Sequence, residues 1–178
     1  GLSAGSYTVT VSDANGCSYI STGVTVGTPS GFTLNVLGDN VSCALGNNGV
    51  ATVTPLGGTA PYIYLWNGGG TSSIKTGLSA GVHTVTVTDA NACIATGSVT
   101  ISEPSALVLN ASGTNISCAG SLDGIANVTV IGGTSPYTYN WSNGSNTSNI
   151  SGLSSGIYTV TVSDANGCTQ VSNAVTIT

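Results

Sequence analysis

Residues 1–17 read GLSAGSYTVTVSDANGC, and nearly the same stretch returns at residues 77–93 (GLSAGVHTVTVTDANAC) and 152–168 (GLSSGIYTVTVSDANGC). Its Thr-Val-Thr-Val run alternates polar and apolar side chains, which predicts a β-strand with valines facing a core and threonines facing water. The Asp-Ala-Asn-Gly that follows predicts a hairpin turn, because Asn and Gly tolerate positive φ. Its return at a fixed long interval indicates a tandem array.

The repeats divide the 178 residues into three parts. Residues 29–103 and 104–178 are two complete copies of equal length, and residues 1–28 match the last third of a copy, which we interpret as a truncated repeat. Matching joints stand at Pro29-Ser30 and Pro104-Ser105. Because no Gly/Ser tract separates the copies, we expect a semi-rigid, elongated rod.

We predict an all-β fold in which each copy is an immunoglobulin-like β-sandwich. Further strands are expected near residues 32–37, 49–55, 62–66 and 98–101, and no segment has a helical period. Tyr7 and Tyr158 open a strand just after a loop, which is the position of a tyrosine corner, and His83 takes this place in the middle copy.

Composition excludes several classes of partner. Lys75 is the only Lys or Arg, and the net charge is −5. Such a chain cannot neutralise a run of phosphates, so we expect no nucleic-acid partner. There is no uninterrupted apolar run long enough to span a bilayer, so we expect no direct membrane insertion.

The five cysteines are interpreted as disulfide partners. Cys43 and Cys93 are separated by the same interval as Cys118 and Cys168, so we predict one disulfide within each copy. Each would contribute about 4 kcal/mol in the chain-entropy model. Cys17 would pair with a cysteine outside the chain. Disulfides indicate a location outside a reducing cytosol.

We predict no enzyme activity, no cofactor and no metal site. The Gly-x-Ser-x-Gly pattern at Gly1, Gly77 and Gly152 resembles a hydrolase nucleophile elbow, but a strand follows it where an elbow needs a helix. There is no Cys-x-x-Cys, and His83 is the only histidine. Asp13, Asp89 and Asp164 are interpreted as turn caps, since one carboxylate in each loop is thin for calcium.

Two aromatic rows are expected in the cores. Alternation places Tyr62, Tyr64 and Trp66 on one face of a strand, and Tyr137, Tyr139 and Trp141 on one face of its counterpart. Such a row can also stack on sugars, but the opposite face in the last copy is polar, which favours core packing. In the middle copy that opposite face carries Ile63 and Leu65, which would form an apolar contact if exposed.

The combined motif is Gly-Gly-Thr-x-Pro-Tyr-x-Tyr-x-Trp, then Gly-Leu-Ser-x-Gly-x-Tyr-Thr-Val-Thr-Val-x-Asp-Ala-Asn-Gly-Cys, then Thr-Ile-x-Glu-Pro-Ser. It resembles the SprB-type repeat of very long surface adhesins in gliding Bacteroidetes bacteria. The resemblance implies secretion to the cell surface and service in a filamentous adhesin involved in gliding motility. The middle copy departs from the motif at His83 and Ala92.

We therefore expect a structural and adhesive segment, the shaft of an extracellular fibre, whose main partners are neighbouring repeats of the same chain. One alternative is a module that binds surface glycans, or ice, through outward-facing threonines. Another is an accessory module of a larger secreted enzyme. Lateral self-association is a further possibility, because few charges protect the strand edges. The candidate threonines are Thr8, Thr10, Thr84, Thr86, Thr159 and Thr161.

Overall fold

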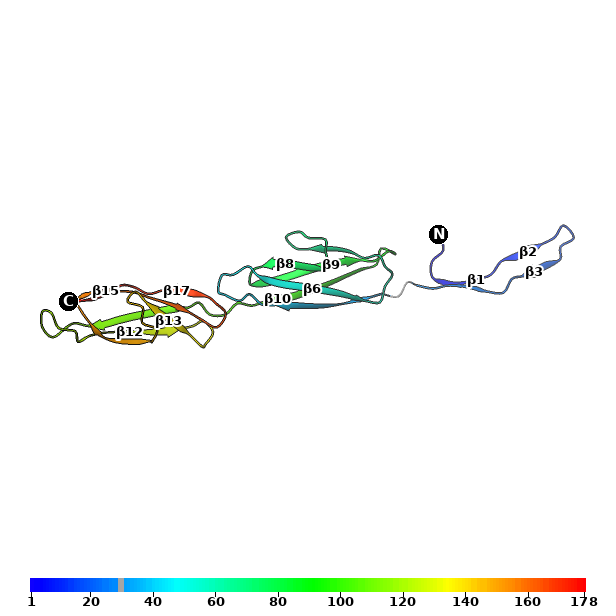
Figure 1. The fold of residues 1–178 in the computed structure, drawn as a ribbon. Helices are drawn as coiled ribbons and strands as arrows, with labels where there is room; N and C mark the ends of the chain where they lie inside the picture. Colours follow the sequence, from blue (N-terminus) through cyan, green and yellow to red (C-terminus); the bar gives the residue numbers. More distant parts are fainter. Residues whose placement is uncertain (29–30) are drawn as a thin grey trace.

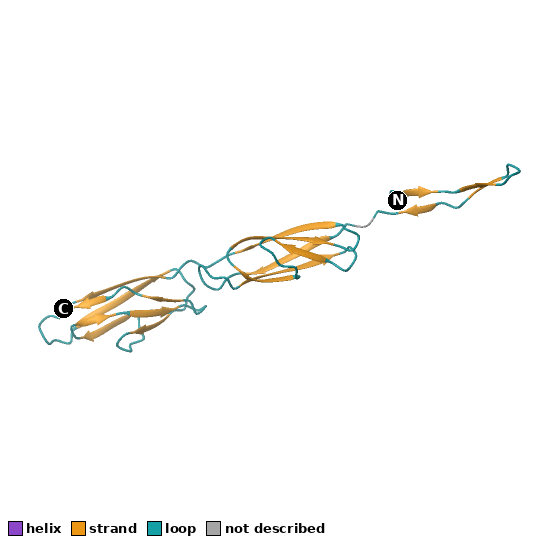
Figure 2. Cartoon of the chain, turned by 90° about the horizontal axis from the view of Figure 1, so that it is seen from above, coloured by secondary structure: helices purple, strands orange, loops and turns teal. Residues whose placement is uncertain are grey.

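The structure, a computed structural model, describes residues 1–28 and 31–178. The described residues form strands and turns and contain no helix (Figure 2). They divide into an N-terminal hairpin and two similar modules, which follow one another end to end (Figure 1). The joint predicted at Pro29-Ser30 lies outside the described residues.

The first module is a sandwich of two antiparallel three-stranded sheets. One sheet has the order β5-β6-β8, and the other has the order β10-β9-β7. The first, second and fourth strands of the module thus form one sheet and face the other three, as in an immunoglobulin-like sandwich. The strands are β5 (Thr33–Asp39), β6 (Gly49–Leu56), β7 (Ile63–Trp66), β8 (Ile74–Leu78), β9 (Gly81–Thr88) and β10 (Ile94–Ile101).

The first and last strands of this module, β5 and β10, lie against each other and run in the same direction. A Cβ on Gly97 would come within 2.6 Å of Val36, and one on Gly38 within 2.7 Å of Ile101. Glycine is needed at both places because the neighbouring strand leaves no room for a side chain. The end of β5 therefore lies at the same end of the module as the end of β10.

The second module repeats this arrangement with interrupted strands. Its sheets have the orders β11-β12-β14 and β13-β16-β17, and a further pair, β15-β18, continues the second sheet. The strands are β11 (Val108–Thr114), β12 (Gly124–Ile131), β13 (Thr138–Trp141), β14 (Asn149–Leu153), β15 (Gly156–Tyr158), β16 (Val160–Ser163), β17 (Thr169–Val171) and β18 (Val175–Ile177).

The interruption between β17 and β18 comes from one extra residue, which the first module lacks. Here Ser172 Oγ accepts a hydrogen bond from Val160 N at 3.1 Å, in place of a backbone acceptor. Asn173 pairs through its side chain with both backbone groups of Ala111. Polar side chains thus restore the pairing that the extra residue breaks.

The N-terminal hairpin has the pairing of the corresponding strands of the second module. It consists of β1 (Gly5–Tyr7), β2 (Thr10–Ser12), β3 (Ser18–Ile20) and β4 (Val24–Val26), with β1 paired to β4 and β2 to β3. Val9 is 62% exposed, whereas its counterpart Val85 in the first module is 1% exposed. Among the described residues, no second sheet covers the apolar face of this hairpin.

Each complete module has its own core. The inward valines of the repeated Thr-Val-Thr-Val run lie on the central strand of one sheet and are buried in both modules. A tryptophan from the neighbouring edge strand, β7 or β13, is buried with them. The valines are Val85, Val87, Val160 and Val162, and the tryptophans are Trp66 and Trp141.

Candidate functional site at the module junction

Cys17, Cys93 and Cys168 each follow a hairpin turn that is held by one aspartate. In the second module Asp164 Oδ1 accepts hydrogen bonds from Asn166 N and Cys168 N, both at 2.9 Å. Its other oxygen, Oδ2, accepts one from Thr134 N at 2.9 Å, which ties the turn to the loop before β13. Asp89 makes the same three contacts in the first module, and Asp13 makes the first two in the hairpin.

These hydrogen bonds favour the ionised carboxylates. The N–H of Thr134 is the largest influence on Asp164 and lowers its pKa, and burial opposes this effect only in part. For Asp89 burial is the largest single influence and raises the pKa, but the N–H groups of Cys93, Thr59 and Asn91 together outweigh it. The pKa values of Asp89 and Asp164 are therefore below the ordinary value of an aspartate.

The turn carboxylates hold backbone N–H groups, as a turn cap does. Within residues 1–28 and 31–178, no group of three His, Cys, Asp or Glu side chains is placed to hold a metal ion. The same described residues form no helix long and apolar enough to cross a membrane.

The serine of each Gly-x-Ser-x-Gly loop is used through its backbone carbonyl. Tyr7 donates its hydroxyl hydrogen to Ser3 O at 2.7 Å, and Tyr158 does so to Ser154 O at 3.2 Å. In the first module His83 Nε2 lies 3.0 Å from the Ser79 carbonyl oxygen. The histidine thus takes the position of the tyrosine, and the loop is part of a corner between strands.

The aromatic rows lie on the inner face of the β7 and β13 strands. Trp66 and Trp141 are buried and donate their indole N–H to Ser72 O and Thr147 O, both at 2.8 Å. The four tyrosines are half-buried against the cores, and those that begin the rows donate to a glycine carbonyl. They are Tyr62, Tyr64, Tyr137 and Tyr139.

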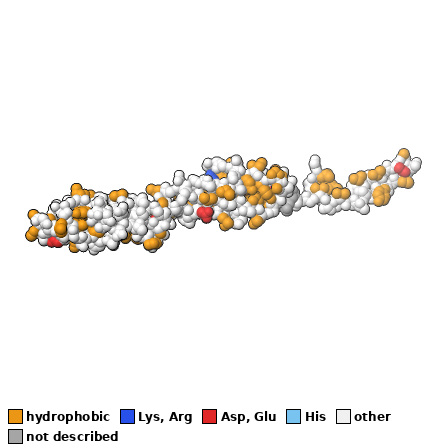
Figure 3. Space-filling model, viewed as in Figure 1, with side chains coloured by type: hydrophobic (Ala, Val, Ile, Leu, Met, Phe, Trp, Pro, Cys, Tyr) orange, Lys and Arg blue, Asp and Glu red, His pale blue; other side chains and the backbone are white. Residues whose placement is uncertain are grey.

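The outer face of β7 differs from that of β13. Ile63 and Leu65 are 68% and 60% exposed, and their counterparts Thr138 and Asn140 are polar. Few charged side chains appear on the face of the molecule in Figure 3. The threonines proposed as ligand contacts lie on or next to the strand that pairs with β7 or β13, and they are exposed or half-buried. In the two modules they are Thr84, Thr86, Thr159 and Thr161.

The predicted disulfides within the modules, Cys43–Cys93 and Cys118–Cys168, are wrong. The structure joins Cys43 of the first module to Cys168 of the second, with a Cα–Cα distance of 5.7 Å, and Cys17, Cys93 and Cys118 are free. The bond therefore crosses from one repeat to the next.

Strand direction explains why the two cysteines of one module do not meet. Cys43 follows β5, and the neighbouring Leu45 N donates to Glu103 Oε2 beyond the end of β10. Cys93 precedes the start of β10. The eight residues of β10 span about 25 Å, whereas disulfide partners have Cα atoms within about 7 Å. The two cysteines lie at opposite ends of the sandwich.

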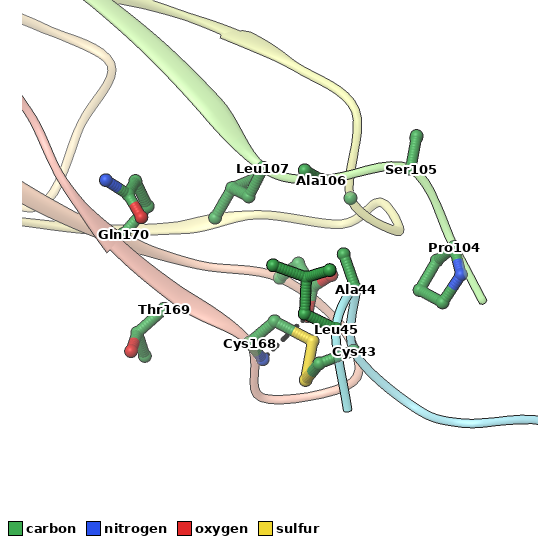
Figure 4. A pocket seen from close by; sticks show the side chains of 12 residues that line it. Cys43, Ala44, Leu45, Pro104, Ser105, Ala106, Leu107, Cys168, Thr169 and Gln170 are labelled. Carbon is green, nitrogen blue, oxygen red and sulfur yellow. Dashed lines mark hydrogen bonds between the residues drawn. A yellow bond between two sulfur atoms is a disulfide. The ribbon is translucent and has the colours of Figure 1, made fainter. Parts of the chain in front are cut away.

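The junction between the modules brings three segments together. The loop after β5 supplies Cys43, the turn before β17 supplies Cys168, and the linker from Pro104 to Leu107 lies beside both (Figure 4). Asn166 Nδ2 donates to Ser42 O at 3.0 Å across the junction. A cavity of about 270 Å³ lies between these segments.

The family comparison matches the part of each module that contains the loop cysteine. The model of the SprB repeat matches residues 39–71 and 110–146. The SprB repeat is therefore found at two regions of the chain, one in each module. The matched ranges include Cys43 and Cys118, and the turns with Cys93 and Cys168 lie beyond them. The covalent link therefore joins the matched part of the first module to the turn of the second.

No curated protein matches the chain. Solved structures that resemble it include the N-terminal eight Ig domains of Down Syndrome Cell Adhesion Molecule isoform 1.30.30, at a TM-score of 0.45 and 13% identity over 97% of this chain. The chain spans 28% of that protein's length. Extracellular domains 3–5 of Drosophila OTK match at a TM-score of 0.34 and 13% identity, covering 98% of this chain and 71% of the other.

The cysteine spacing in the sequence is compatible with the disulfide between modules as well as with disulfides within them. The separation of 125 between Cys43 and Cys168 equals the interval from Cys43 to Cys93 plus the length of one repeat. In a tandem array a pairing within repeats and a pairing between neighbours have the same regularity. The strand directions, and not the spacing, decide between them.

Proposed function

We propose that the chain is a non-enzymatic structural segment, which forms part of the shaft of an extracellular surface fibre or adhesin. The observation that carries the proposal is the Cys43–Cys168 disulfide, which fastens one SprB repeat to the next at their ends. A bond at this place fixes how neighbours follow one another, and this is the property that a shaft needs.

Several features support an extracellular, gliding-adhesin role. Disulfides persist in oxidising environments outside the cytosol. The SprB repeat resembles those of very long surface adhesins in gliding bacteria, so display of an adhesive end at a distance from the cell is the role we assign. Because only 4% of the residues are charged, the hydrophilic surface of the modules consists mainly of Thr, Ser, Asn and Gly.

Two measurements test this function. Antibodies raised against the full chain should label intact cells that make the parent protein, and external protease should remove the label. Labelling that requires lysis would contradict the surface location. In solution, scattering of X-rays by the chain should show a single extended shape, and Cys43→Ser with Cys168→Ser should broaden the distribution of its longest dimension.

A lateral contact between copies is a second candidate, supported by the exposed Ile63 and Leu65 on β7. β7 forms the edge of its sheet, and an edge strand with apolar side chains is able to pair with another chain. Replacing the pair by the residues of the second module, Ile63→Thr and Leu65→Asn, should reduce self-association in sedimentation at high concentration. Unchanged association would remove this candidate.

A further inference from the structure

Two free cysteines occupy the positions of the two that are bonded. Cys118 stands one full repeat after Cys43, in the same loop of the second module, and Cys93 stands one full repeat before Cys168, in the same turn of the first module. They lie at the two far ends of the pair of modules, because each module carries its loop cysteine at one end and its turn cysteine at the other.

The turn around the free Cys93 has the same hydrogen bonds as the turn around Cys168, which is bonded at the junction between the modules. Asp89 holds Asn91 N and Cys93 N at 2.9 Å, as Asp164 holds the equivalent groups beside the bonded Cys168. Asn91 Nδ2 donates to Thr59 Oγ1 at 2.9 Å, and Asn166 Nδ2 donates to Thr134 Oγ1 at 3.1 Å. At the closed junction the same Asn166 amide also donates to Ser42 O of the other module.

The loop around the free Cys118 likewise has the same kind of hydrogen bonds as the loop around the bonded Cys43. Ser117 N donates to Asp123 Oδ1 at 3.1 Å, as Ser42 N donates to Asn48 Oδ1 at 3.0 Å beside the bonded Cys43. The carbonyl of Cys118 accepts from Ser121 N at 3.0 Å, and the carbonyl of Cys43 accepts from Gly46 N at the same distance. The loop is also tied to the last strand in both modules, through Asn40 and Asn115.

We propose that Cys118 and Cys93 are the two open halves of the same junction. Cys118 forms a disulfide with the turn cysteine of a following SprB repeat, and Cys93 forms one with the loop cysteine of a preceding repeat. The partner repeat comes either from the same polypeptide or from a second copy of this chain. This inference rests on the shaft function and adds the means by which successive repeats are joined. Because the two halves differ, the association is head-to-tail and open-ended.

The chemistry is thiol–disulfide exchange with a small disulfide such as oxidised glutathione. One protein thiolate attacks oxidised glutathione, forms a mixed disulfide and releases one glutathione. The second protein thiolate attacks the mixed disulfide and releases the other. Two protein thiols and one oxidised glutathione thus give one protein disulfide and two glutathione molecules.

The surroundings of Cys93 affect the rate of this exchange. Burial raises the pKa of the Cys93 thiol, and the nearby charge of Asp89 and a hydrogen bond to it raise the pKa further. Since the thiolate is the attacking species, linkage through Cys93 is expected to be faster at mildly alkaline pH than at neutral pH.

The test uses the full chain with Cys17→Ser, incubated with a glutathione redox buffer at high protein concentration. Cross-linked peptides are then identified by mass spectrometry, with the Cys43–Cys168 peptide as an internal control for folding. If a second copy is the partner, Cys118–Cys93 peptides dominate and covalent oligomers form a ladder. The variants Cys93→Ser and Cys118→Ser, each with Cys17→Ser, should not form this ladder alone, and their mixture should give dimers.

A second arm carries an extra copy of residues 104–178 after residue 178 and is studied at low concentration. If the same polypeptide supplies the partner, Cys118 bonds to the turn cysteine of the added copy while the chain remains monomeric. The proposal is overturned if Cys118 bonds neither to Cys93 of a second copy in the first arm nor to the turn cysteine of the added copy in the second arm. It is also overturned if cross-links form at random among the free thiols, or if the Cys43–Cys168 peptide itself is absent. These outcomes are independent of whether antibodies label the cell surface.

Discussion

Leu45 and Ala92 are residues other than glycine with positive φ, at 59° and 62°. Their counterparts in the second module are Gly120 and Gly167, which have φ values of 85° and 79°. Side chains with a Cβ are disfavoured in this region because the Cβ crowds the following carbonyl oxygen. The first module therefore keeps the turn conformation of the second at a cost in free energy.

Replacing Ala92 by Gly should raise the stability of the first module. We expect the free energy of unfolding to increase by about 1 kcal/mol, since Gly adopts positive φ without steric cost. Denaturation in urea measures the change. The matched control is Gly167→Ala, which should lower the stability of the second module by a similar amount, and an unchanged midpoint in both variants would contradict the turn geometry.

The turn aspartates predict loss of stability in acid. The pKa values of Asp89 and Asp164 are lowered in the folded protein, so the folded state binds fewer protons than the unfolded state as acid is added. Stability is then complete above the pKa of an unfolded aspartate, near pH 4, and falls as the pH drops through the folded value. Melting temperatures between pH 2.5 and 7 should show this decline. Asp89→Asn with Asp164→Asn should flatten it.

The strands β7 and β13 each contribute a tryptophan that fills a core. Trp141 is 2% exposed and its indole N–H is satisfied by Thr147 O. Trp141→Ala should destabilise the second module by about 3–5 kcal/mol, because truncation leaves a cavity and an unpaired carbonyl. A matched control is Leu65→Ala on the exposed face of β7, which should change stability by less than about 0.5 kcal/mol. Chemical denaturation compares the two.

The alternation of the repeated strand predicted which of its side chains face the cores, and the Asp-Ala-Asn-Gly pattern predicted the position of the turns. Both patterns follow from the backbone geometry of residues that are close in sequence. The pairing of Cys43 depends instead on the direction in which β5 and β10 run and on how one module follows another. The spacing of the cysteines determines neither property. The sequence therefore located the cysteines correctly, but the predicted pairing was wrong.

The break between β17 and β18 illustrates the same limit within one sheet. The sequence has one residue more between Cys168 and Val175 than between Cys93 and Val99, although the two copies are equal in length. Only the structure shows that Ser172 and Asn173 replace the lost backbone hydrogen bonds with side-chain ones. Insertions change side-chain partners, which no periodicity describes.

The link across the two modules predicts a cost when it is removed. Within residues 31–178 neither module has an internal disulfide, and the Cys43–Cys168 loop encloses most of both. Cys43→Ser with Cys168→Ser should lower the stability of the pair by up to about 5 kcal/mol in the chain-entropy model for so long a loop. Calorimetry of the variant and of the reduced chain should agree. Cys118→Ser, which leaves the bond intact, should melt like the unmodified chain.

The same bond sets the path that tension takes through the molecule. When the two ends of the chain are pulled apart, the shortest covalent path runs through the sulfur atoms of Cys43 and Cys168 and bypasses residues 44–167. These residues would otherwise release about 400 Å of extended chain on unravelling. A fibre built in this way can have its repeats opened by force and yet grow little in length, and reduction of the bond would make it extensible.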